Sequence, residues 1–311
     1  MTEKPQRLVF GEMLCELGAE NEKIVVLDAD VSSSTQSRHF GEKFPDRFFN
    51  FGIAEANMIS AAAGFATCGY VPFVSTFALF ITMRAGDQLR AQIAGPKLNV
   101  KLIGGYAGLS DYADGSSHQS VEDLAVVRAV PNLTVISPSD ITETRMALRA
   151  MSEADGPMFL RISRDVVTED YGPDHPFEIG RAITLRDGGD VTLIATGTMV
   201  RLARGAADRL AKKGVEARVI DMHTLKPLDH DAVEAAAEET GCIVTVEEHN
   251  IYGGLGSAVC ESVCERRPVP VFRVGIPDRF GETGAYKTIL ARAGLSEENI
   301  AATAERALRS R

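Results

Sequence analysis

Cysteine is scarce in this sequence. Five cysteines are scattered over 311 residues, at positions 15, 68, 242, 260 and 264. An odd and scattered set does not form a disulfide framework, and a chain of this length can build a large core without one. Cys260 and Cys264 have the i, i+4 spacing of a helix, but no second Cys/His pair lies nearby in the sequence to complete a tetrahedral zinc site. We therefore expect reduced thiols and no metal held by this chain.

Long apolar runs and an excess of positive charge are also lacking. No window approaches the roughly 20 consecutive apolar residues of a membrane-spanning helix, and the N-terminal MTEKPQRLVFGEML has no apolar core of a signal peptide. Thirty-three Lys and Arg residues against 43 Asp and Glu residues give a formal net charge of −10, which opposes binding to a phosphate backbone. We therefore expect a cytoplasmic protein that binds neither membranes nor nucleic acid.

The residues that are present have the proportions of a globular protein, 45% hydrophobic and 24% charged. In the first half, short apolar runs such as IVVLD at 24–28 and VPFVST at 71–76 alternate with segments of helical period, one of which extends to about Ile93. Such alternation predicts a parallel sheet covered on both faces by helices. After a polar stretch that contains RDGGD, the same alternation restarts at about residue 189.

This pattern predicts an α/β protein with two domains, each a mainly parallel sheet flanked by helices. The expected boundaries are residues 1–170 for the first domain, 171–188 for a linker and 189–311 for the second domain. Open parallel sheets bind ligands beyond the carboxyl ends of their strands. We therefore expect the functional residues in the loops that follow the strands.

Glu55 lies near the start of AEANMISAAAGFA, whose small residues predict a helix packed closely against its neighbours. The helix dipole favours a glutamate in the first turn by about 0.3–1 kcal/mol, which is a sufficient structural reason for its presence. The preceding FFNFGI is apolar, however, so the carboxylate is expected to be partly withdrawn from water. Such a carboxylate suits a proton-sharing role.

Phe77 and Phe80 follow the predicted strand at 71–76 with i, i+3 spacing, and such a pair usually belongs to a hydrophobic core. Two rings at the carboxyl end of a strand could also form the wall of a site for a flat heterocycle. His118 lies in the polar segment YADGSSHQSVEDLA, where a histidine is more often functional than on an apolar face. A Ser/His/Asp hydrolase is the competing interpretation, but the sequence contains no G-x-S-x-G motif.

Four stretches, taken together and in order, resemble the transketolase family. They are FNFGIAEANMISAAAGFATCGYVPFVSTFALF, DGSSHQSVEDLAVVRAVPNLTVISPSD, VIDMHTLKPLD and EEHNIYGGLGSAV. The resemblance extends from about residue 8 to about residue 305 and is to the C-terminal half of a transketolase that is split into two subunits. It implies a pyrimidine-binding domain, a transketolase C-terminal domain and thiamine diphosphate as cofactor.

The resemblance also implies roles for single residues. Glu55 matches the family glutamate that hydrogen-bonds the aminopyrimidine ring nitrogen and so activates the cofactor, which carries a two-carbon fragment from a ketose to an aldose. Phe77 and Phe80 match rings that stack on the pyrimidine, and Asp30 matches an aspartate near the cofactor. The residues matched to substrate contacts are Asp114 for a donor hydroxyl, His118 for substrate oxygens, and Ser34 and Arg164 for a distal phosphate.

The chain departs from the family pattern around the substrate. Tyr106 stands where the family usually has a substrate-binding histidine, and Ser110 and Tyr112 replace a glycine pair. Ala56 stands where a histidine often follows the glutamate. A neutral phenol cannot offer a phosphate the charge-assisted hydrogen bond of an imidazolium. We therefore expect a substrate that differs from the usual sugar phosphates at its distal end.

The family's diphosphate site has no match in this chain. Thiamine enzymes bind the diphosphate through Mg²⁺ with a G-D-G motif and a downstream Asn, and the sequence contains no G-D-G. The resemblance therefore implies that this chain binds the pyrimidine half of the cofactor and that a partner subunit holds Mg²⁺. The implied partner is an N-terminal transketolase subunit in an α2β2 heterotetramer.

Two other functions are compatible with parts of the pattern. The beta subunit of a 2-oxo acid dehydrogenase shares the fold, the glutamate and the need for an alpha partner, but DGSSHQSVEDLAVVR followed by ISPSD favours transketolase. A non-catalytic scaffold of the same fold is the second alternative. The joint presence of Glu55, Phe77, Phe80, Asp114 and His118 argues against it.

Overall fold

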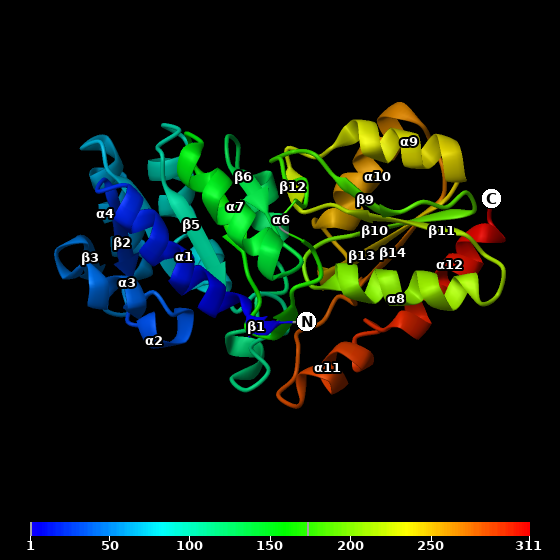
Figure 1. The fold of residues 1–311 in the computed structure, drawn as a ribbon, viewed down its shortest axis with the longest axis horizontal. Coiled ribbons are helices and arrows are strands. Elements are labelled where there is room, and N and C mark those ends of the chain that lie inside the picture. Colours follow the sequence, from blue (N-terminus) through cyan, green and yellow to red (C-terminus); the bar gives the residue numbers. More distant parts are fainter. Residues whose placement is uncertain (1, 173) are drawn as a thin grey trace.

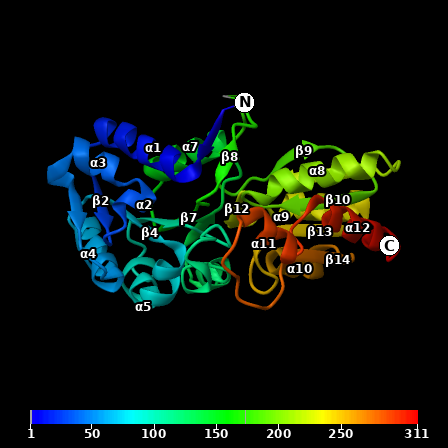
Figure 2. The same ribbon diagram turned by 90° about the horizontal axis from the view of Figure 1, so that it is seen from below.

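Two open sheets covered by helices organise the chain in the computed structural model, which describes residues 2–172 and 174–311. The two halves lie side by side along the long axis of the molecule (Figure 1). Most neighbouring strands run parallel, and helices cover both faces of each sheet (Figure 2). The predicted class, α/β with mainly parallel sheets flanked by helices, is confirmed.

The first sheet has seven strands in the order β12-β6-β7-β5-β4-β2-β3. Its neighbours are parallel except β12, which comes from the second half of the chain and runs antiparallel to β6. Strands β2 and β5 are buried along their whole length, as expected for strands covered on both faces. The strands are β2 (Ile24–Asp28), β3 (Phe48–Asn50), β4 (Val71–Phe77), β5 (Lys101–Gly105), β6 (Thr134–Ile136), β7 (Met158–Arg161) and β12 (Thr224–Lys226).

Helices α1 and α7 cover one face of this sheet, and α4 and α5 cover the other (Figure 2). Instead of the continuous helix expected up to about Ile93, residues 80–94 form two wide π-helical turns, Phe80–Arg84 and Leu89–Ala94, on either side of α5. Such turns are rare and often occur at functional sites. The helices are α1 (Gln6–Glu20), α2 (Ser32–Thr35), α3 (Arg38–Lys43), α4 (Glu55–Thr67), α5 (Gly86–Gln88), α6 (Asp123–Ala129) and α7 (Ile141–Glu153), with 3₁₀ turns at Pro45–Arg47 and Gly115–Ser117.

The second sheet has five strands in the order β14-β13-β10-β11-β9. Only β9 is antiparallel to its neighbour. Helices α9 and α10 lie on one face and α8 and α12 on the other (Figure 1). The elements are β9 (Ile183–Arg186), β10 (Val191–Ala195), β11 (Ala217–Asp221), β13 (Ile243–Asn250), β14 (Val271–Ile276), α8 (Met199–Ala211), α9 (His230–Thr240), α10 (Leu255–Arg266), α11 (Tyr286–Arg292) and α12 (Glu297–Leu308).

Strand β9 lies inside the segment 171–188 for which the sequence predicts a linker. It is a four-residue edge strand with partly exposed residues, so it lacks the continuous apolar run that reveals a buried strand. Strand β8 (Val166–Thr168), which precedes this segment in the sequence, pairs with β1 (Glu3–Pro5) in a two-stranded antiparallel ribbon. The second sheet thus begins at residue 183, while the limits of the two domains stay a prediction.

The two halves share one apolar core. A single cluster of buried side chains includes Val127 and Leu133 from the first half and Ile220, Leu225 and Val259 from the second. Strand β12 also extends the first sheet with residues of the second half. The relative position of the two halves is therefore determined by close packing and by strand pairing.

Several expectations concern what the chain does not contain. All five cysteines are free thiols. Within residues 2–172 and 174–311, no three His, Cys, Asp or Glu side chains are grouped so that they could hold a metal ion. No helix in the same ranges is both long enough and apolar enough to cross a bilayer.

Candidate active site

The predicted site residues gather at the carboxyl edge of the first sheet. The strand register aligns the ends of β2 and β4, where Asp28 pairs with Ser75, and the ends of β4 and β5, where Phe77 pairs with Gly105. The loops that follow these strands and β7 therefore leave the sheet together. The loop after β2 carries Val31 and Ser34, and the segment after β4 carries Phe80. The loop after β5 carries Tyr106, and the loop after β7 carries Arg164.

Three buried rings form an aromatic cluster at this edge, Phe77, Phe80 and Tyr106. Phe77 stacks on Tyr106 with ring centroids 4.2 Å apart and on Phe80 at 5.5 Å. The ring of His118 meets Phe77 and Phe80 edge-on, at 6.0 and 5.4 Å. Both interpretations of these rings are therefore compatible with the structure. The rings are buried core residues, and they also lie against a polar histidine.

Glu55 is the first residue of α4, and its side chain is 1% exposed. Its Oε1 accepts a hydrogen bond of 2.9 Å from Arg84. Its Oε2 is buried and has no hydrogen-bond partner in the described part of the chain. Leaving a buried polar atom without a partner costs about 1–3 kcal/mol, and more for a charged group. This oxygen is therefore an acceptor that a bound ligand can satisfy.

Arg84 connects Glu55 to the aromatic cluster. It ends the π-helical turn that Phe80 begins, and its guanidinium carbon lies 4.0 Å from the centroid of the Phe80 ring. The guanidinium is thus a planar group that contacts an aromatic ring and donates an N–H to the glutamate at once. No sequence motif marked Arg84, because its partner Glu55 is 29 residues away.

Arg164 lies beside the aromatic cluster. It donates a hydrogen bond of 2.9 Å to Asp111, and its backbone N–H donates to the Ser110 hydroxyl at 3.1 Å. Its guanidinium also lies 5.1 Å from the ring centroid of Tyr106 and 4.9 Å from that of Tyr112. Three of the four residues that depart from the family pattern, Tyr106, Ser110 and Tyr112, therefore contact Arg164.

Asp111 is a further acidic residue that the sequence did not single out. It is buried, and burial together with the negative charge of nearby Asp114 raises its pKa to about 6, against the opposing charges of Arg164 and His118. Asp114 itself is exposed, and His118 is half-buried with its Nδ1 2.9 Å from the Ser117 hydroxyl. Two carboxylates, a histidine and an arginine thus lie together beside the rings.

Arg7 brings a second arginine to Tyr106. It donates 2.7 Å to the Tyr106 hydroxyl and 3.0 Å to the carbonyl of Ser34. Arg7 lies in α1, a helix that is not among the elements predicted from the sequence, so its arrival at the site was not foreseen. Tyr106 is consequently flanked by two guanidinium groups, those of Arg7 and Arg164.

Asp30 is the predicted residue that the structure leaves apart from this group. Its carboxylate is exposed and accepts a 3.2 Å hydrogen bond from Asn50 at the end of β3. Its neighbour Val31 packs against the aromatic cluster, as does Leu79. Its assignment to the cofactor stays a prediction.

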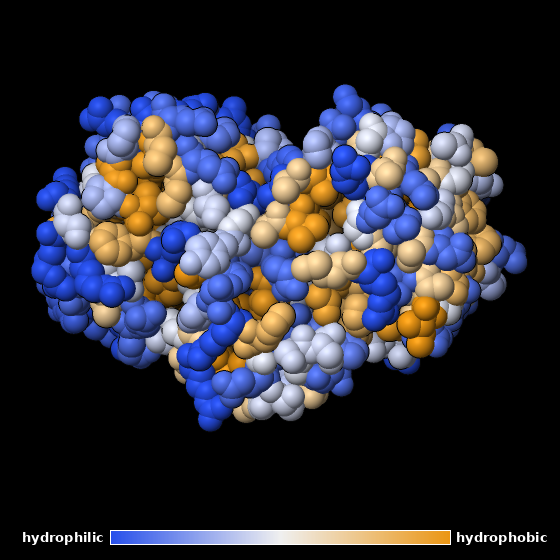
Figure 3. All heavy atoms as spheres, turned by 180° about the vertical axis from the view of Figure 1, so that it is seen from behind, coloured by the Kyte–Doolittle hydropathy of each residue, from blue (hydrophilic) through white to orange (hydrophobic). Residues whose placement is uncertain are grey.

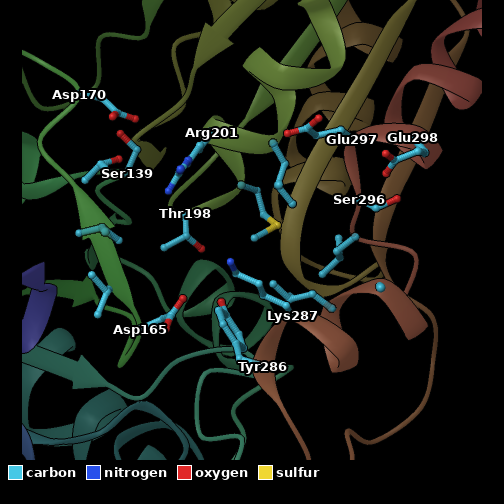
Figure 4. A pocket seen from close by; sticks show the side chains of 18 of the residues that line it. Ser139, Asp165, Asp170, Thr198, Arg201, Tyr286, Lys287, Ser296, Glu297 and Glu298 are labelled. Carbon is cyan, nitrogen blue, oxygen red and sulfur yellow. The ribbon is translucent and has the colours of Figure 1, made fainter. Parts of the chain in front are cut away.

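A cavity of about 450 Å³ lies outside this site, between the end of the first domain and helices α8 and α11. Asp165, Thr198, Arg201, Tyr286 and Lys287 point into it from different elements (Figure 4). None of the residues predicted for catalysis, cofactor or substrate lines it. The chemistry expected from the sequence therefore belongs to the strand ends and not to this cavity.

Comparison with known proteins identifies the family. The family model described as "Transketolase, pyrimidine binding domain" matches residues 3–169, and "Transketolase, C-terminal domain" matches residues 180–300. The chain belongs to the transketolase family.

Relatives and a solved structure are similar over almost the whole chain. A protein of Methanocaldococcus jannaschii named as a transketolase C-terminal section is 42% identical over 96% of this chain and 94% of its own. A 6-deoxy-6-sulfo-D-fructose transketolase subunit of Clostridium sp. is 39% identical over 94% of this chain and 91% of its own. A solved structure described as a split-gene transketolase, an inactive beta4 tetramer, superposes with a TM-score of 0.90 at 45% identity and covers 98% of both chains.

The pKa of Asp111 gives a prediction that needs no ligand. Because the folded chain raises this pKa from 3.8 to about 6, the carboxylate opposes folding above pH 6, and this opposition disappears as the pH falls from about 6 to about 4. We expect Asp114→Asn to lower the titration midpoint of Asp111 and Arg164→Gln to raise it. Carboxyl ¹³C shifts in a pH titration measure both, with the exposed Asp208→Asn as control. A wild-type midpoint near 4 would contradict the arrangement.

Proposed function

We propose that this chain is the C-terminal subunit of a two-subunit, thiamine diphosphate-dependent transketolase, which transfers a two-carbon ketol unit from an anionic ketose to an aldose. The observation that carries the proposal is the buried Oε2 of Glu55, which has no partner in the described residues, on a carboxylate whose other oxygen is bound by Arg84, the arginine that lies over the Phe80 ring. The family membership and the relatives named as transketolase subunits support it. They favour it over the beta subunit of a 2-oxo acid dehydrogenase.

The residues around Glu55 fit the aminopyrimidine half of thiamine diphosphate. That group is planar and can donate from nitrogen, and the Arg84 guanidinium, which has the same two properties, contacts both Phe80 and Glu55. Glu55 would accept a hydrogen bond from the pyrimidine ring nitrogen and hold a proton there, and Phe80 would contact the ring face. When bound, the cofactor supplies an electron sink for the two-carbon fragment. Phe77 stacks on Phe80. By the same proposal, Phe77 and Asp30 would border the cofactor.

The polar residues beside the rings fit a hydroxylated, anionic substrate. His118 and Asp114 would bind donor oxygens, and the buried Asp111 holds Arg164 in place. Arg7 and Arg164 flank Tyr106, so positive charge is available even though a phenol replaces the family histidine. With Ser34 they would bind the terminal anion of the substrate. A relative named for a sulfonated fructose supports a terminal anion other than phosphate as one solution at this position.

A partner subunit completes the proposed site. The diphosphate and Mg²⁺ would be held by an N-terminal transketolase subunit in an α2β2 heterotetramer. Apolar side chains next to the site are exposed, Ile53 by 76% and Met83 by 52%, and they adjoin Glu55 and Arg84 in the sequence. Apolar patches interrupt the hydrophilic surface on both lobes (Figure 3). The similar structure described as an inactive assembly of beta chains supports the need for a second kind of subunit. The cytoplasmic location stays a prediction.

The chain alone should bind thiamine diphosphate weakly or not at all, because the residues that bind the diphosphate would come from the partner. Calorimetry with Mg²⁺, with and without the co-expressed neighbouring subunit, measures the difference. We expect tight binding only with both subunits. Tight, Mg²⁺-dependent binding by this chain alone would refute the split site.

Replacement of Glu55 tests its role at the ring nitrogen. We expect Glu55→Gln to lower kcat of the reconstituted enzyme by at least about 100-fold, because general acid–base groups contribute about 10²–10⁴. The fold should survive, as checked by circular dichroism, since the amide has the same shape as the carboxylic acid. Glu42→Gln, at an exposed glutamate, is the control. A Glu55→Gln enzyme with wild-type kcat would refute the role of Glu55 at the ring nitrogen.

The terminal-anion contact predicts a selective effect of Arg7. Arg7→Ala should raise KM for xylulose 5-phosphate about tenfold, the cost of one charge-assisted hydrogen bond, with little change for uncharged erythrulose. Tyr106→His should raise kcat/KM for xylulose 5-phosphate. Equal losses with both ketoses would exclude the anion role of Arg7. A wild type that already turns over xylulose 5-phosphate efficiently, with no gain in Tyr106→His, would show that Tyr106 does not change the substrate.

A further inference from the structure

The loop that carries the substrate residues is closed on itself and attached to the second domain. This site loop, residues 106–120, contains Asp111, Asp114 and His118. Two backbone hydrogen bonds close its base, from Gly108 N to Ser120 O at 2.8 Å and from Ser120 N to Gly108 O at 3.1 Å. Just beyond it, Asn250 of β13 donates to the carbonyl of Val121 at 2.7 Å.

One side chain of the second domain enters the base of the site loop. Glu248, on β13, is 3% exposed, and its Oε1 accepts a 2.7 Å hydrogen bond from the backbone N–H of Leu109. Its Oε2 accepts hydrogen bonds from the hydroxyls of Tyr286 at 2.7 Å and Thr198 at 3.2 Å. Tyr286, at the start of α11, and Thr198, just before α8, also line the cavity of Figure 4. These two residues therefore hold Oε2 of Glu248, while the loop backbone holds Oε1.

Gly108 shows how closely the loop and the carboxylate are packed. A Cβ atom at Gly108 would lie 2.6 Å from Oε1 of Glu248, and the φ of Gly108 is +63°. The left-handed backbone and the missing side chain together let the loop turn directly over the carboxylate. The contact is therefore between loop backbone and Glu248 and does not depend on any loop side chain.

We propose that Glu248 is a positioning residue that sets the site loop for substrate binding, so that the second domain controls the placement of Asp111, Asp114 and His118. The proposal rests on the proposed function for its kinetic consequences. Its structural consequence, a loop ordered by Glu248, holds whatever the reaction.

The charges around Glu248 give the proposal a pH dependence. Arg161 of β7 donates 2.8 Å to the Glu248 carbonyl and is itself paired with Asp123 of α6. Burial raises the pKa of Glu248 to about 7, although Arg161 and the donors from Tyr286, Leu109 and Thr198 oppose the shift. Further acids in this region are Glu247 on β13, Asp165, whose charge acts on Tyr286, and Glu122, whose charge interacts with those of Asp123 and His249. Protonation below pH 7 adds a donor where three donors already point, which weakens the hold on the loop.

The neighbouring Glu247 is a matched control. It lies on the same strand and is 1% exposed, but its carboxylate accepts hydrogen bonds from the backbone N–H groups of Leu255 and Gly256, at 2.6 and 2.8 Å. It therefore holds the start of α10 and not the site loop. A merely structural effect of losing a buried glutamate should appear equally at both positions.

Hydrogen exchange tests the loop itself. In the full chain, Glu248→Ala should speed amide exchange at Leu109 and across residues 106–120 at least tenfold, while Glu247→Ala should affect α10 instead. Tyr286→Phe, which removes one hydrogen bond to Oε2, should give a smaller change in the same direction. If Glu248→Ala does not fold, Tyr286→Phe decides. Unchanged loop exchange in a folded Glu248 variant would overturn the proposal, and this result does not depend on the thiamine reaction.

Kinetics of the reconstituted enzyme separate positioning from stability. Glu248→Ala should raise the donor KM about tenfold with a smaller change in kcat. Glu248→Gln adds a donor as protonation does but keeps an oxygen that can accept from Leu109, so its KM should lie between those of the wild type and Glu248→Ala and should no longer rise as the pH falls through about 7. A Glu248→Gln variant whose KM still rises at low pH would overturn the proposal. A Glu247→Ala variant whose KM is raised as much as that of Glu248→Ala would also overturn it. A wild-type complex without transketolase activity would refute the proposed function alone and leave the exchange result to decide on Glu248.

Discussion

A buried carboxylate with one oxygen satisfied and the other free is the interaction on which this account of the site depends. Glu55 begins α4 beneath the π-helical turn Phe80–Arg84, so its Oε1 reaches Arg84 while Oε2 has no partner in the described residues. Water cannot reach Oε2, and an unsatisfied buried oxygen is costly. In the proposed function this oxygen is the acceptor for an aminopyrimidine, close to Arg84 and the Phe80 ring that Arg84 contacts.

The rest of the site is assembled by elements that are distant in the sequence. The parallel register brings the loops after β2, β4, β5 and β7 to one edge, and α1 adds Arg7 to them. The second domain contributes through the Glu248 carbonyl, which accepts a hydrogen bond from Arg161 of β7, and through the Glu248 carboxylate at the base of the site loop. In the proposed arrangement the first domain would supply the reacting groups, and the second would restrain the loop that carries part of them.

Much of the fold and part of the site could be predicted from the sequence. Features that leave a local pattern were found, and features that depend only on tertiary contacts were missed. The apolar runs at 24–28 and 71–76 correspond to β2 and β4, because burial on both faces leaves a continuous apolar run, and the small-residue segment at Glu55 corresponds to α4. Helix α1 was missed, since its buried residues include Gln6, Gly11 and Gly18 and form no clear apolar stripe. Arg7, Arg84 and Asp111 were missed because only tertiary contacts over 27 or more positions give them a role.

The distance between Glu55 and the cofactor tests the central claim most directly. A crystal structure of the two-subunit complex with thiamine diphosphate and Mg²⁺ would measure it. The account predicts that Oε2 of Glu55 lies about 2.7–3.2 Å from the pyrimidine ring nitrogen, with the ring in contact with Phe80. A pyrimidine bound elsewhere, with Oε2 still lacking a partner, would contradict it.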